Sequence, residues 1–173
     1  MELERVARSC VNGGLVFALL ALAIASASAQ TGVAPPTALV QQLTKLKPVD
    51  RFASLPAAIK GGRFTVDGNS AAGWQMAEPG GAFNASDAVI PGLPGRRLIF
   101  AACTSDLCVI HYERGGVAHF YEILVLRLSG SGWSAIWNVV GSKAIPSLDA
   151  FRAILNRSGL GRTWRPQPVR GDF

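Results

Sequence analysis

Residues that carry catalytic chemistry are scarce in this chain. It has three cysteines and two histidines among 173 residues. It contains no HExxH, paired CxxC, calcium-loop, GxSxG or phosphate-binding glycine pattern. The common signatures of zinc proteases, serine hydrolases and nucleotide-binding enzymes are therefore missing. The acidic residues also form no evident facing pair of the kind that glycosidases use. The sequence favours a non-enzymatic protein, and we expect no cofactor.

Long hydrophobic runs are also rare. The one unbroken apolar stretch, Gly14–Ala25, has 12 residues, whereas a helix that spans a bilayer needs about 20. Arg5 and Arg8 precede this stretch, and a small-residue Ala-x-Ala motif lies just before Gln30. This arrangement predicts a secretory signal peptide over residues 1–29, with an uncleaved anchor as the alternative. We expect a periplasmic or secreted mature chain without a stable membrane span.

The charge of the chain is basic but not patterned for nucleic acid. The net charge is +6, and removal of the signal segment leaves it unchanged, because that segment holds two basic and two acidic residues. No basic stripe is interleaved with aromatic residues, so we expect no nucleic-acid partner. A protein or an envelope polymer is the expected partner, and an anionic surface also fits the charge. The mature chain keeps two cysteines, Cys103 and Cys108, which we expect to form a disulfide in an oxidising compartment.

Hydrophobic periodicity divides the mature chain into three segments. We expect an N-terminal helical segment over residues 30–61, an α+β domain over 62–158 and a basic extended tail over 159–173. The predicted fold class is α+β: an antiparallel β-meander of about four to six strands, with a C-terminal helix packed on one face and a short N-terminal helix. The expected helices cover residues 37–47, 56–60 and 147–158, the last with Ser147 as N-cap; the expected strands cover 63–66, 73–77, 97–103, 107–113, 117–128 and 133–140; and residues 78–94 form a long loop.

Two tight turns predict how the strands pair. A two-residue type I′ turn at Gly115–Gly116 would place Tyr112 opposite His119. A bend at Ser105–Asp106 would place the two cysteines opposite each other, within disulfide range. Both faces of the sheet become apolar toward Ile123–Leu126, so we expect both to be covered. The C-terminal helix would cover one face, and the N-terminal helix or a second subunit the other.

The predicted pairing gathers amphipathic side chains at one hairpin end. Tyr112, His119 and Tyr121 would share a face, with Arg114 at its rim. Such side chains are enriched in recognition surfaces. We therefore predict an exported binding or inhibitor-like module that uses these four residues. Trp133 and Trp137 are expected on one face of the last strand, either in the core or on a binding surface.

Two alternatives from other classes remain. His111, Glu113 and Glu122 would share the opposite face, where one imidazole and two carboxylates could hold the metal of a secreted hydrolase. The spacing of these residues matches no known ligand motif. The second alternative is a structural cell-envelope component that self-associates as a homo-oligomer through the apolar Ile123–Leu126 segment.

Overall fold

The computed structural model describes residues 35–61, 64–66, 69–71, 74–130, 132–157, 160 and 163–167. The predicted signal peptide over residues 1–29 and Cys10 lie outside these residues. The described elements are, in chain order, α1 (Thr37–Leu43), β1 (Lys47–Val49), the 3₁₀ turn η1 (Phe52–Ser54), α2 (Ala57–Gly61), β2 (Phe64–Val66), β3 (Asn69–Ala71), β4 (Arg96–Cys103), β5 (Leu107–Arg114), β6 (Phe120–Ser129), β7 (Gly132–Gly141), α3 (Leu148–Arg157) and β8 (Trp164–Pro166).

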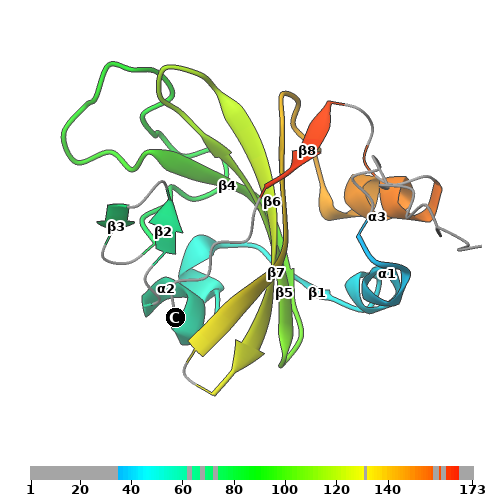
Figure 1. The fold of residues 1–173 in the computed structure, drawn as a ribbon. Coiled ribbons are helices and arrows are strands. Elements are labelled where there is room, and N and C mark those ends of the chain that lie inside the picture. Colours follow the sequence, from blue (N-terminus) through cyan, green and yellow to red (C-terminus); the bar gives the residue numbers. More distant parts are fainter. Residues whose placement is uncertain are drawn as a thin grey trace, which may run out of the picture.

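One antiparallel sheet of six strands organises the molecule, in the order β1-β4-β5-β6-β7-β8. Four consecutive strands form a meander because short turns join long runs rich in β-branched and aromatic residues. β1 and β8, from the segments before and after the meander, pair with its two outer strands. The predicted α+β class, with its antiparallel meander and two helices, is confirmed (Figure 1).

Both faces of the sheet are covered, as their apolar character predicts. Helices α1 and α3 lie together on one face, which we call the α3 face (Figure 1). The other face, called the α2 face, packs against α2 and the irregular segment that contains Trp74 and Met76. The N-terminal helix α1 therefore packs on the same face as the C-terminal helix α3. The opposite face, where the N-terminal helix was expected, is covered by the short helix α2 instead.

The N-terminal helix is shorter than its apolar spacing predicts. α1 ends at Leu43, and Lys47 begins the edge strand β1. Pro48 pairs with Ala102 at this edge. Proline is tolerated there because an edge strand leaves one side of its backbone without a ladder partner. The second strand expected over 73–77 is not seen in the described part of that range, residues 74–77, where Ala77 alone makes an isolated bridge, and β3 forms instead at Asn69–Ala71.

Two local predictions are confirmed. The Ser147 hydroxyl accepts a hydrogen bond from the backbone N–H of Ala150 at 3.2 Å, which caps the start of α3. Cys103 and Cys108 lie opposite each other across the β4–β5 turn and form a disulfide. That cross-link connects the strands at the end of the sheet opposite the β5–β6 hairpin loop.

The register of the β5–β6 hairpin differs from the prediction. Tyr112 pairs with Glu122, and Arg114 with Phe120, so residues 115–119 form a five-residue loop in place of a two-residue turn. The pairing is shifted by three residues, an odd number, which reverses the face of every β6 side chain relative to β5. Of the two glycines only Gly116 has a positive φ, whereas a type I′ turn requires it at both positions.

Close packing against a neighbouring loop explains the second glycine. A Cβ atom on Gly115 would lie 1.8 Å from the carbonyl oxygen of Asn84. The backbone N–H of Gly115 also donates to the Gly95 carbonyl at 3.2 Å. The glycine pair therefore lets the hairpin loop contact residues 84–95, and it does not form the tight turn that the pair predicts.

A β-bulge separates the two tryptophans of β7. Val125 pairs with Trp137, whereas Leu126 pairs with Ala135, so Ile136 is an extra residue in the strand. Trp137 consequently packs on the α3 face, and Trp133 packs on the α2 face. The expectation that both rings share one face is wrong, because alternation along the strand is interrupted between them.

Candidate binding site at the loop end of the sheet

The chemistry-bearing side chains gather at one end of the sheet, where β4 begins, β5 ends and β6 begins. Residues 78–95 and the hairpin loop 115–119 extend beyond the strands here, and Figure 1 shows the two loops projecting past the same end. We call this region the loop end. The four residues predicted to form a binding face lie in it, but the observed register divides them.

Tyr112 is a core residue. Its side chain is fully buried on the α2 face, and its hydroxyl donates to Glu122 Oε2 at 2.6 Å. Burial, together with the negative charge of Glu122, raises the pKa of Tyr112 well above its usual value. Arg114 shares this face and pairs with Glu122 at 3.3 Å. Tyr112 cannot contact a ligand at the surface, so the binding role predicted for it has no structural support.

His119 and Tyr121 lie together in a different cluster. The His119 ring stacks on Tyr121 with centroids 5.1 Å apart, and the ring of Phe83 meets it edge-on at 5.9 Å. Its Nε2 donates to Glu113 Oε2 at 2.8 Å. His119 is in the hairpin loop, whereas Tyr121 is in β6, so the longer loop brings their rings together.

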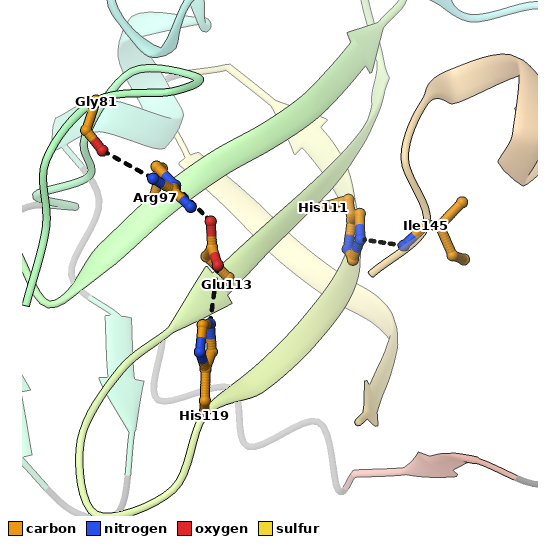
Figure 2. Close-up of polar contacts among 6 residues, drawn as sticks. All are labelled: Gly81, Arg97, His111, Glu113, His119 and Ile145. Carbon is orange, nitrogen blue, oxygen red and sulfur yellow. Dashed lines mark hydrogen bonds and ion pairs between the residues drawn. The ribbon is translucent and has the colours of Figure 1, made fainter. Parts of the chain in front are cut away.

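Glu113 connects this cluster to the preceding loop. Its buried carboxylate also accepts from Nε of Arg97, which lies opposite it on β4. Arg97 in turn donates to the carbonyl of Gly81 at 3.2 Å and lies 4.6 Å from the centroid of the Phe83 ring. Figure 2 shows this chain of contacts from Gly81 through Arg97 and Glu113 to His119. Strands β4 and β5 thus hold both loops at the loop end in one arrangement.

His111 lies deeper in the sheet and is satisfied by the protein. Its Nε2 accepts from the backbone N–H of Ile145 at 3.1 Å, so its Nδ1 carries the proton and donates to the carbonyl of Glu122 at 2.7 Å. Figure 2 shows the contact with Ile145. Burial lowers the pKa of His111 from 6.5 to about 4, although its hydrogen bond to Glu122 and the charge of Glu113 oppose the shift.

The alternative metal set is not assembled. Both ring nitrogens of His111 are engaged by backbone groups, and the Glu122 side chain belongs to the α2 face, opposite that of Glu113. Across the described part of the chain, no group of three or more His, Cys, Asp and Glu side chains is placed to hold a metal ion. The predicted sharing of one face by the three residues depended on the hairpin register, which was wrong.

The long loop before β4 is ordered by one buried side chain. Asn84 donates from Nδ2 to the carbonyls of Ile90 and Leu93 at 3.2 and 2.8 Å, and its Oδ1 accepts from the N–H of Ile90 at 2.7 Å. Its backbone N–H also donates to the Pro94 carbonyl at 2.8 Å, which closes the base of the loop. Residues 84–94 therefore form a compact loop held by its own amide side chain.

This ordered loop and the hairpin present apolar side chains to solvent. The exposed large hydrophobic side chains in the described residues all belong to the loop end: Val89 (77% exposed), Ile90 (57%), Val117 (96%) and Phe120 (37%). We call these four residues the apolar tip. Sequence reasoning missed Val89 and Ile90 because two aliphatic residues in a glycine- and proline-rich stretch carry no periodic signal. It missed Val117 and Phe120 because it placed both inside a strand over residues 117–128.

No protein-family model, curated protein or solved structure matches the chain. None of the helices in the described residues has the length and apolar character that a membrane crossing requires.

Proposed function

We propose that this protein is an exported binding module that meets its partner through the loop end of the sheet. The observation that carries this proposal is that all four exposed large hydrophobic side chains of the described residues lie at the loop end, in its two loops and at the start of β6. Exposed apolar surface concentrated in one region of a protein is typical of interaction sites. Loops positioned by a rigid scaffold are also the usual place for binding residues.

The order of these loops supports the proposal. Three side-chain hydrogen bonds of Asn84 shape one loop, and the contacts of Glu113 with Arg97 and His119 connect both loops to the strands. A surface that is already ordered pays less conformational entropy when it binds. Of the four residues predicted from sequence, His119 and Tyr121 remain in the proposed surface. Arg114 flanks it, and Tyr112 only supports it from the core.

Export supports a binding role outside the cytoplasm. The N-terminal sequence has the pattern of a signal peptide, and the Cys103–Cys108 disulfide fits an oxidising compartment. We expect the purified mature protein to begin at Gln30 and to contain no thiol that reacts with an alkylating agent before reduction. A full-length cytosolic chain in which Cys103 and Cys108 are both alkylated would contradict this part of the proposal.

Site-specific photocrosslinking in the producing cells tests the binding surface. A benzophenone amino acid replaces Val117 in one variant and Arg157, an exposed residue at the end of α3, in the control. We expect a reproducible crosslinked product from position 117 and none from position 157. A second probe replaces Val89. Equal crosslinking from positions 117 and 157 would contradict binding through the loop end, and so would the absence of a crosslink from both position 117 and position 89.

A further inference from the structure

The loop end combines its apolar tip with a row of cationic side chains. On the α2 face, Arg96 lies directly opposite Arg114, and Arg114 lies opposite Phe120. These three residues form the last row of the sheet before the loops begin. Two like charges placed directly across a strand pair repel each other, so this row stores unfavourable electrostatic energy unless an anion offsets it.

A carboxylate of the protein neutralises the positive charge of one of the two arginines. Glu122 accepts an ion pair from Arg114. Arg96 has no ion pair with any carboxylate in the described residues, since their four ion pairs involve Arg97, Arg114, His119 and Arg152. The row therefore keeps a net positive charge, in a chain whose overall charge is +6. An anionic partner would relieve the repulsion.

The apolar and cationic groups are arranged at different depths. Arg96 and Arg114 are at strand ends, whereas Val117 is three residues further into the hairpin loop and is 96% exposed. Val89 and Ile90 occupy the neighbouring loop. The aliphatic groups of the tip thus lie in the loops that follow the row, whereas Phe120 lies within the row. A lipid bilayer presents the complementary order, with anionic headgroups outside and hydrocarbon below them.

We propose that the loop end docks on a bilayer that contains anionic lipids, with the apolar tip entering the interface and Arg96 and Arg114 at the headgroups. This inference rests on the proposed binding role of the loop end and names its partner. A bilayer requires aliphatic groups beyond cationic ones, whereas a protein partner requires no such order. The three aliphatic side chains of the tip lie in two separate loops, and Phe120 begins β6 in the row of the arginines.

Asp87 gives the proposal an internal test, because its exposed carboxylate lies in the same loop as Val89. A negative charge near an anionic headgroup weakens docking. Asp87→Asn should therefore strengthen binding to anionic vesicles, whereas Arg96→Gln should weaken it about fivefold. Arg157→Gln removes an equal charge from the end of α3 and serves as the matched control.

Cosedimentation of the purified, disulfide-bonded mature protein with vesicles tests whether the loop end docks on an anionic bilayer. The vesicles contain phosphatidylcholine alone or with phosphatidylglycerol. We expect binding only with phosphatidylglycerol, at least a tenfold loss in Val117→Asp and no change in Arg157→Gln. Because Val117 is almost fully exposed, its replacement should leave the thermal unfolding temperature unchanged. Inorganic phosphate is then added as a competitor. If it abolishes vesicle binding equally in the original protein and in Val117→Asp, the loop end is a simple anion site and the proposal is overturned.

The outcome also separates this inference from the proposed function. If the vesicles are not bound, or if Val117→Asp binds them as well as the original protein, bilayer docking is wrong. A crosslink from position 117 to a protein would then leave the proposed binding role in place with a different partner. Failure of both the vesicle assay and the crosslinking would remove the loop end as a binding surface.

Discussion

The buried histidine predicts a specific loss of stability in mild acid. His111 is fully buried, and burial lowers its pKa to about 4 from the 6.5 expected in the unfolded chain. Between these values the unfolded state binds a proton that the folded state does not bind. The free energy of unfolding therefore falls as the pH decreases through this window, and this contribution is fully present only above pH 6.5.

The size of the pKa shift of His111 determines how much the free energy of unfolding decreases in acid. A difference from 6.5 to about 4 corresponds to about 3 kcal/mol once both states are protonated, and about 2 kcal/mol of this is lost by about pH 5. The loss has a structural cause. A protonated Nε2 cannot accept the hydrogen bond from the N–H of Ile145, which lies between β7 and α3.

Urea unfolding followed by tryptophan fluorescence, at several pH values between 7 and 5, measures this dependence. In His111→Gln the amide oxygen can still accept from Ile145 but does not titrate, so its pH dependence should be flatter by about 2 kcal/mol. His119→Gln, at the other histidine of the chain, is the control and should keep the steep dependence. Equal slopes for the original protein and His111→Gln would refute this reasoning.

Three further predictions concern the packing of the loop end and the opposite end of the sheet. Gly115→Ala should destabilise the protein by about 3 kcal/mol, since its Cβ would overlap the Asn84 carbonyl, whereas Gly95→Ala meets no atom within 4 Å and should change the thermal unfolding temperature little. Asn84→Ala removes three hydrogen bonds and should speed amide hydrogen exchange in residues 85–93, and unchanged exchange there would contradict its ordering role. Serine at both Cys103 and Cys108 should lower the free energy of unfolding by about 2 kcal/mol in urea titration, because the disulfide closes a short loop.

The sequence predicted the parts of the fold that periodicity and turn chemistry determine locally. The runs that became β4 to β7 were recognisable from their β-branched and aromatic residues, and Ser147 indicated the start of α3. The cysteine pairing followed from a bend of two residues. The short strands β1 and β8 carry three residues each, too few to show a period, and they form because partner strands supply hydrogen bonds.

The candidate site was less predictable because it depends on contacts between distant segments. Because Gly115 has no Cβ, it can lie close to Asn84, which is distant in the sequence. In the sequence, the glycine that this contact requires cannot be distinguished from the glycine of a tight turn. The resulting change of register placed Tyr112 and Tyr121 on opposite faces and made Glu122 a partner of Tyr112. The bulge at Ile136 separated Trp133 from Trp137 in the same way. A shift of one or three residues alters every side-chain direction that follows.

Amide hydrogen exchange of the mature protein, with and without envelope membranes from the producing cells, tests the central claim most directly. Binding through the loop end predicts slower exchange in residues 84–93 and 115–120, together with unchanged exchange in α1 and α3. Protection confined to the helices or to the edge strand β8, or no protection anywhere in the presence of these membranes, would contradict the assignment of the loop end as the binding surface.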